Sequence, residues 1–158
     1  MHSRIYQTSI QPIPEFDYIK ESNYYDHWFT NSIADYVNGD TDRVEDIKWL
    51  KECYDGKGLE FGVDDGGEYF VIVDKMRFFE ENFNTFQTTL RELMDASIDS
   101  FVSHKIDSLV YRLKSMYDDE FGFYVQDDNC GLCTLDYMIR SKAEGSKFYI
   151  GATIDYHF

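Results

Sequence analysis

Residues 59–73 contain two short runs of β-favouring residues that flank a turn signal. The runs are 59–63 and 68–73, and the residues between them read Asp-Asp-Gly-Gly. Gly and Asp tolerate the positive φ angles that tight hairpin turns require. Because the two strands of a hairpin run antiparallel, the sequence predicts an antiparallel sheet at this point.

Further strands are predicted at both ends of the chain. Residues 4–10 read as an extended segment, and Pro12 and Pro14, the only prolines, exclude a helix directly after it. Near the C-terminus, three β-rich runs cover residues 121–126, 131–139 and 148–155, with turns at 127–130 and 141–146.

Helical spacing of apolar residues fills the regions between these strands. It predicts a helix over residues 23–37 and a second helix that is capped by Asp40 or Thr41 and ends at Gly56 and Gly58. From 79 to 116 the apolar residues recur at steps of three and four, and Ser97 is a possible cap within that region. The pattern leaves open whether residues 79–116 form one helix or two.

Segregated helices and strands, as opposed to alternating ones, indicate an α+β fold. We expect an antiparallel sheet, made of the hairpin at 59–73 and the strands within 121–155, packed against about four helices. The length of 158 residues fits a single domain, 1–158. Hydrophobic residues make up 43% of the chain, which is enough to build a core.

The charge balance limits the possible partners. Thirty acidic residues against fifteen basic ones give a net charge of −15. Direct binding to nucleic acid or to an anionic membrane is disfavoured by like-charge repulsion, so a basic protein is the expected partner. The alternative is that the charge serves solubility alone. The sequence does not indicate an oligomeric state.

Cellular location is inferred from two absences. The chain has no apolar run resembling a signal peptide or a membrane span, and its three cysteines are too few for a disulfide framework. A cytoplasmic protein, in the cytosol of the host cell, is therefore expected.

Motifs for catalysis and cofactor binding are weak. Cys130 and Cys133 form a C-x-x-C, but Asp127 and Asp128 precede it, and nearby negative charge raises a thiol pKa. A metal site would need further ligands, and no second pair has ligand spacing. Phosphate-binding and dinucleotide-binding glycine motifs are missing. We therefore expect no enzyme activity, no catalytic residues, no metal and no cofactor.

Carboxylates interleaved with aromatic residues are the remaining signal. Aromatic residues make up 18% of the chain, and runs such as Tyr24-Tyr25-Asp26 recur along it. Carboxylates with neighbouring tyrosines can bind arginine-rich protein through ion pairs and cation–π contacts. The candidate partner-binding residues are Asp40, Asp42, Glu45, Asp46, Glu52, Asp64, Asp65, Asp118, Asp119 and Glu120.

In size, acidity, aromatic content and lack of a catalytic motif, the whole chain resembles the small anti-defence proteins of phages and mobile elements. These include anti-CRISPR and anti-restriction proteins that mimic nucleic acid. The resemblance implies an inhibitor that occupies the nucleic-acid-binding surface of a basic nucleic-acid-processing enzyme. Two alternatives stay open: an immunity protein or antitoxin of a nuclease toxin, and a small metal or redox protein that uses Cys130 and Cys133.

Overall fold

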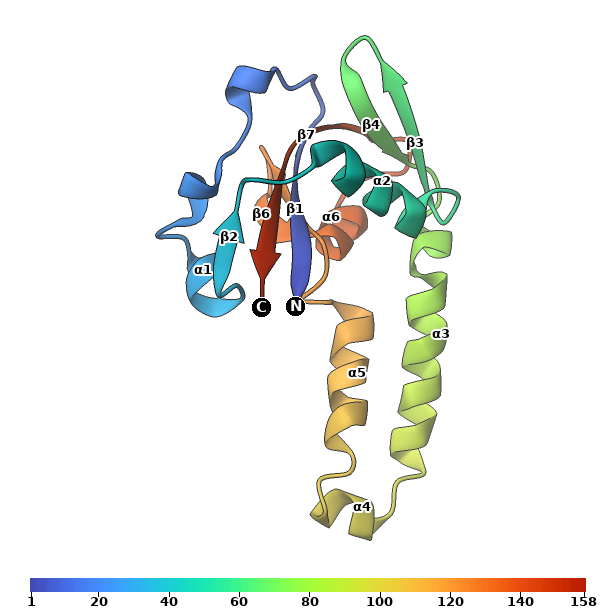
Figure 1. Cartoon of the computed structure of the whole chain (residues 1–158). Coiled ribbons are helices and arrows are strands. Elements are labelled where there is room, and N and C mark those ends of the chain that lie inside the picture. The colour runs from blue at the N-terminus through green and yellow to red at the C-terminus, as the bar shows by residue number, and fades with distance from the viewer.

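Seven strands and six α-helices make up the chain, and a computed structural model describes all of residues 1–158 (Figure 1). The strands are β1 His2–Ser9, β2 Tyr36–Asn38, β3 Leu59–Asp64, β4 Gly67–Ile72, β5 Tyr124–Asp127, β6 Gly131–Thr134 and β7 Lys147–His157. The helices are α1 Trp28–Ser32, α2 Arg43–Tyr54, α3 Lys75–Met94, α4 Ile98–Val102, α5 Asp107–Tyr117 and α6 Leu135–Ser141. Two 3-10 turns, Glu15–Asp17 and Glu21–Tyr24, precede α1.

The strands form one sheet in the order β3-β4-β7-β1-β5-β6, and β2 pairs with the end of β7. All strand pairs are antiparallel except β1 with β5. The expected α+β fold and the hairpin at 59–73 are therefore confirmed, with six α-helices where about four were expected.

Two apolar clusters lie on opposite faces of the sheet. The neighbouring residues Ile5 and Tyr6 of β1 belong to different clusters, as the alternation of side chains along a strand requires. The larger cluster includes Leu50 of α2 and Met138 of α6, so these two helices cover its face. Phe29 of α1 belongs to the smaller cluster on the other face.

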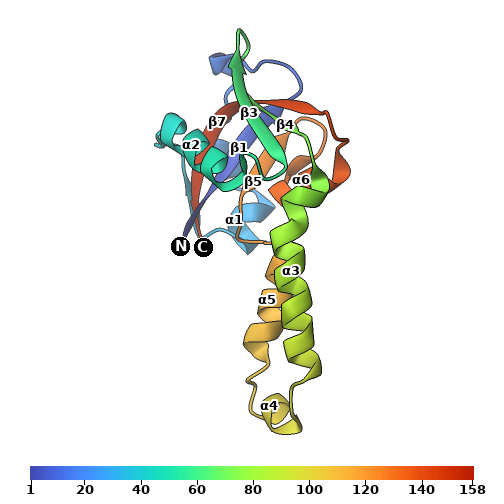
Figure 2. The same ribbon diagram turned by 90° about the vertical axis from the view of Figure 1, so that its right-hand side faces the viewer.

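The helical region after β4 projects away from the sheet (Figures 1 and 2). α3 and α5 run side by side in opposite directions, and the short α4 lies at the far end. The open question about residues 79–116 is thus settled as three separate helices, and Ser97 caps α4 by accepting from Ser100 N. We call residues 75–117 the helical hairpin, and residues 1–74 with 118–158 the sheet body.

Two predicted elements are wrong. The helix expected at 23–37 is only the five-residue α1, since the chain then forms β2 against the end of β7. The strand expected at 131–139 stops at Thr134, whose side chain accepts from Tyr137 N and caps α6. Leu135, Met138 and Ile139 are buried at helical spacing.

None of the helices combines the length and the apolar character that crossing a bilayer requires.

Candidate partner-binding surfaces

The ten candidate acidic residues do not form one patch. Six of them are exposed to solvent, and all six lie in the sheet body: Asp40, Asp42, Glu45, Glu52, Asp64 and Asp65. The other four have structural neighbours that occupy or bury their carboxylates.

On α2, the expected row of carboxylates is interrupted. Asp42 caps the helix by accepting from Val44 N at 3.1 Å and Glu45 N at 3.2 Å. Glu45 accepts from Lys48 Nζ at 3.1 Å, which places a cation between Glu45 and Glu52. Of the acids on this helix, Glu52 is therefore the one that is both exposed and without a hydrogen bond or ion pair.

Asp46 was expected on the contact surface, but the structure buries it. The residue is only 5% exposed, and the carboxylate faces inward. Oδ1 accepts from Arg4 Nε at 2.6 Å, and Oδ2 accepts from Thr153 Oγ1 at 2.7 Å. Asp46 thus joins α2 to the sheet and is not available to a partner.

Asp64 ends β3, and Asp65 follows it in the β3–β4 turn. Asp64 pairs with Lys147, and its Oδ2 also accepts from Tyr149 Oη at 3.1 Å. The bond from Lys147 lowers the pKa of Asp64 below its usual value. Asp65 has no such neighbour and is free at the tip of the turn.

Asp118, Asp119 and Glu120 lie where α5 returns to the sheet body, and none is fully exposed. Asp118 accepts from Thr134 Oγ1 at 2.8 Å, and Glu120 accepts from Lys114 Nζ at 2.6 Å. Asp119 lines a cavity of about 130 Å³ together with Tyr54 and Asp136. These acids therefore stabilise the junction of the hairpin and do not form an outward patch.

Asp136 was not among the expected site residues. It is 8% exposed, lines the same cavity, and its side chain makes no hydrogen bond. Burial raises the pKa of Asp136 to about 6, and the charges of Asp118 and Asp119 act in the same direction. Burial likewise raises the pKa of Asp119. A signal for Asp136 existed in the sequence, because its neighbours Leu135, Met138 and Ile139 have helical spacing.

The C-x-x-C pair lies on the β5–β6 turn and on β6, and both thiols are free and partly exposed. Burial raises the pKa of Cys133 to about 12, and Cys130 and Asp127 contribute in the same direction. A thiol with so high a pKa is a poor nucleophile at neutral pH. No group of three or more His, Cys, Asp or Glu side chains is placed to hold a metal ion.

Charge is divided unequally between the two parts of the molecule. The helical hairpin carries six basic and six acidic residues and is neutral. The sheet body carries nine basic and twenty-four acidic residues, so it holds the whole net charge of −15. The net charge of the whole sequence does not reveal this division, because the charge of each part depends on where the hairpin begins and ends.

Comparison with known proteins finds no matching family model, no matching curated protein and no matching solved structure. The class that the fold defines is an α+β domain with a projecting helical hairpin. Function is therefore inferred from the chemistry of this chain alone.

Proposed function

We propose that the chain is a binding protein that inhibits a basic nucleic-acid-processing enzyme. In this proposal the carboxylates of the sheet body cover the enzyme's nucleic-acid-binding surface. The observation that supports it is the confinement of the entire net charge of −15 to the sheet body.

Internal ion pairs leave the net charge of the sheet body unchanged but leave few of its basic residues free. Most of its basic residues already pair with carboxylates: Arg4, Arg43, Lys48, Lys142 and Lys147. Few cations are left to neutralise the remaining acids. Among the candidate acids, Asp40, Glu52 and Asp65 are exposed and their carboxylates have neither an ion pair nor a hydrogen bond, so they are the residues we assign to partner contact.

The sheet body also exposes tyrosine side chains. Tyr25, Tyr36 and Tyr137 are each about half exposed or more, and all three belong to the sheet body. A tyrosine ring beside a carboxylate offers a guanidinium group both a cation–π face and an ion pair. This chemistry favours a partner that is rich in arginine, as nucleic-acid-binding surfaces are.

The proposal is tested by capturing the partner from a lysate of the native host and measuring competition. We expect a nucleic-acid-binding enzyme whose complex with this chain is displaced by the enzyme's own nucleic acid. Association should weaken as salt rises, because exposed charges are screened beyond about 8 Å at physiological ionic strength.

Charge reversal locates the contact surface. The triple variant Asp40→Lys, Glu52→Lys, Asp65→Lys should weaken binding about tenfold or more through lost complementarity. A matched variant reverses three exposed acids of the neutral hairpin, Glu81→Lys, Glu92→Lys and Asp107→Lys, and should bind almost as well as the parent. Equal losses in the two variants, or a partner whose complex does not compete with nucleic acid, would contradict the proposal.

A further inference from the structure

The helical hairpin exposes an unusual amount of apolar surface for its size. It contains ten of the chain's twenty-one exposed large hydrophobic side chains. They are Met76, Phe83, Leu90 and Met94 of α3, Ile98, Phe101 and Val102 of α4, and Val110, Tyr111 and Tyr117 of α5. Monomeric proteins rarely expose contiguous apolar surface on this scale, and such a surface usually marks an interaction site.

Helical spacing gathers half of these side chains on one face. Met76, Phe83 and Leu90 are seven residues apart on α3, as are Val110 and Tyr117 on α5, so each set forms a stripe along its helix. Phe83 and Tyr117 line the same pocket, which places the two stripes on the same side of the hairpin. We call this side the apolar face.

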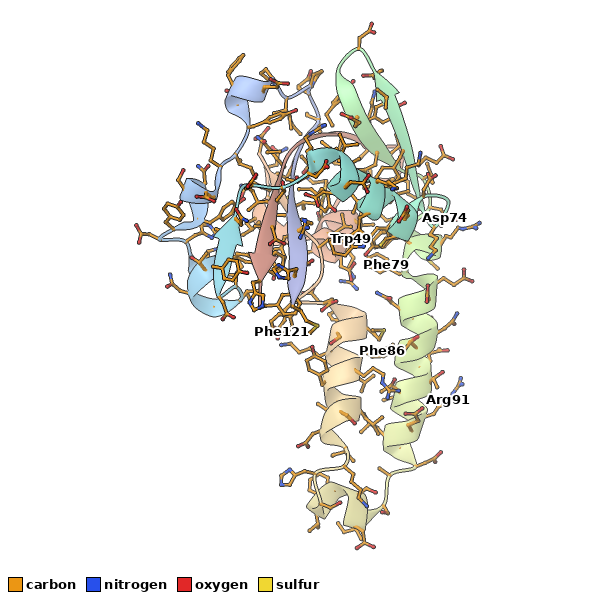
Figure 3. All side chains as sticks on the ribbon, viewed as in Figure 1. Trp49, Asp74, Phe79, Phe86, Arg91 and Phe121 are labelled. Carbon is orange, nitrogen blue, oxygen red and sulfur yellow. The ribbon has the colours of Figure 1, made fainter.

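The chain's own residues bury the neighbours of the α3 stripe more than they bury the stripe itself. Phe86 lies between α3 and α5, whereas Arg91 points away from α5 (Figure 3). Phe79, Phe86 and Leu93 of α3 are half-buried, but Met76 is 83% exposed and Phe83 is 58% exposed. The positions 76, 79, 83, 86, 90 and 93 alternate steps of three and four, which is the spacing of a helix that packs against further helices.

A groove opens on this face where the hairpin leaves the sheet body. Its volume is about 820 Å³, and Met76, Phe79, Phe83 and Arg140 are among its lining residues. The guanidinium of Arg140 lies 4.4 Å from the ring centre of Phe79 and 4.7 Å from that of Tyr117. The groove at the base of the hairpin thus combines these apolar side chains with polar and charged ones, which also include Asp74, Lys75, Arg77, Glu80 and Asn84.

The helical hairpin has no net charge, but its basic and acidic residues are distributed unevenly between its base and its tip. Its base half, residues 75–86 and 108–117, has four basic and two acidic residues. Its tip half, residues 87–107, has two basic and four acidic residues. A second hairpin that lies antiparallel to the first therefore sets each acidic tip against a basic base.

We infer that the apolar face binds a second copy of this chain, with the two hairpins antiparallel and face to face in a four-helix bundle. The charge pattern is self-complementary in this orientation, which is what a two-fold interface between identical chains requires. The exposed Ile98, Phe101 and Val102 at the tip then meet the apolar side chains of the groove at the partner's base. Four-helix bundles bury stripes of this kind at their centre.

Length and charge are compatible with this dimer. A helix of twenty residues, as α3 is, spans about 30 Å, and two adjacent helices are about 20 Å wide. Treated as a flat rectangle, this side of the hairpin has an area of about 600 Å². That area approaches the ~800 Å² that each partner buries in a standard interface, and the uneven surface of the side chains adds to it. The two sheet bodies lie at opposite ends, several screening lengths of about 8 Å apart, so their repulsion is weak.

Sedimentation or light scattering of the whole chain tests the inference. At a chain concentration of about 100 μM we expect a dimer, with twice the chain mass of 18.7 kDa. On dilution below that concentration, we expect the dimer to dissociate into monomers. The variant Phe83→Lys, Leu90→Lys should raise the dissociation constant about a hundredfold or more, since a desolvated apolar contact is replaced by charge. These lysines change the net charge from −15 to −13, so a loss of dimer cannot come from greater overall repulsion.

A matched control makes the same change of net charge, from −15 to −13, away from the apolar face with Glu81→Gln and Thr88→Lys. Both positions are exposed on α3, and this variant should dimerise like the parent. Thermal unfolding shows whether each variant is folded. The inference is overturned if the parent chain is a monomer at about 100 μM, or if the two variants lose the dimer equally. The apolar face would then be assigned to a different protein.

Orientation is tested by reversing charges at the two ends. Asp95→Lys with Asp99→Lys makes the tip basic and should weaken the dimer about tenfold. Adding Arg77→Glu and Lys114→Glu to the same chain should restore it, because the complementarity is then rebuilt with opposite signs. Failure of the four-residue variant to recover would overturn the antiparallel arrangement. None of these readouts involves the acidic surface of the sheet body, so this inference and the proposed inhibition fail separately.

Discussion

Arg4 donates from Nε to Oδ1 of Asp46 at 2.6 Å and so ties the first strand to α2. The guanidinium also pairs with Asp155 of β7. Thr153 and Arg4 together satisfy both oxygens of Asp46, and Tyr6 Oη donates to the Asp46 carbonyl at 2.8 Å. An acid that the sequence pattern suggested as a contact residue is thus an internal link between helix and sheet.

Removing that link should destabilise the fold. Asp46→Ala leaves the largely buried Arg4 with one acidic partner instead of two, and the loss should be about 3 kcal/mol in the free energy of unfolding. Asp42→Ala, four residues earlier, removes only an exposed helix cap and should cost about 1 kcal/mol. Urea unfolding measures both, and similar losses would contradict the structural role of Asp46.

The stability of the chain should depend on pH through Asp136. Its pKa rises from 3.8 in the unfolded chain to about 6 in the folded one, which corresponds to about 3 kcal/mol. The folded state therefore binds this proton more tightly. The loss of folding free energy that comes from ionising the buried Asp136 is absent below the unfolded pKa and complete above the folded pKa. Asp136→Asn should stabilise the protein by about 2 kcal/mol near pH 7.5.

The same substitution should have little effect near about pH 4, where Asp136 is already protonated when folded. Comparing the unfolding of the two proteins at both pH values cancels the contributions of the other carboxylates. A stability difference that does not change with pH would show that Asp136 is not the titrating group.

Native Cys133 should react slowly with iodoacetamide. Its pKa of about 12 leaves about one thiol in ten thousand ionised near pH 8, and the thiolate is the reactive form. Unfolding in urea should accelerate alkylation at this site about a hundredfold or more. Peptide mass spectrometry follows Cys133 by itself, and rapid labelling of the folded protein would reopen the redox alternative.

Gly58 should be the least replaceable glycine near the base of the hairpin. Its φ is +102°, and a Cβ there would lie 2.7 Å from Phe78 Cβ and overlap the carbonyl of Asp74. Gly58→Ala should therefore cost about 3 kcal/mol, from backbone strain together with the steric clash. Gly56, with φ of +69° and open space around it, is the control, and its alanine variant should cost about 1 kcal/mol. Equal unfolding midpoints would argue against the clash.

Local signals predicted the elements that depend on neighbouring residues. The hairpin at 59–73 and the glycines after α2 are determined by turn chemistry within a few residues, whereas the predicted cap of α2, Asp40 or Thr41, is wrong because Asp42 caps this helix. The short α1 was not predictable in this way. Tyr36 pairs with His157, more than a hundred residues later, and the two rings stack with centroids 5.2 Å apart.

The candidate site was predicted less well than the fold. Residue types alone do not show whether a carboxylate points outward, as Glu52 does, or into a network, as Asp46 does. The seven-residue spacing of Met76, Phe83 and Leu90 was visible in the sequence but equally typical of core packing. Only the placement of α5 shows which side of that helix is left uncovered.

The pairing of β1 with β7 has a consequence for the order in which the chain acquires structure. Ile5 lies opposite Ile154, so the centre of the sheet joins the first and last segments of the sequence. Closing so long a loop is slow compared with forming the local α3–α5 contacts. During synthesis, the helical hairpin therefore emerges from the ribosome before β7 does. Until β7 emerges, the apolar side chains of the hairpin have no completed sheet beside them.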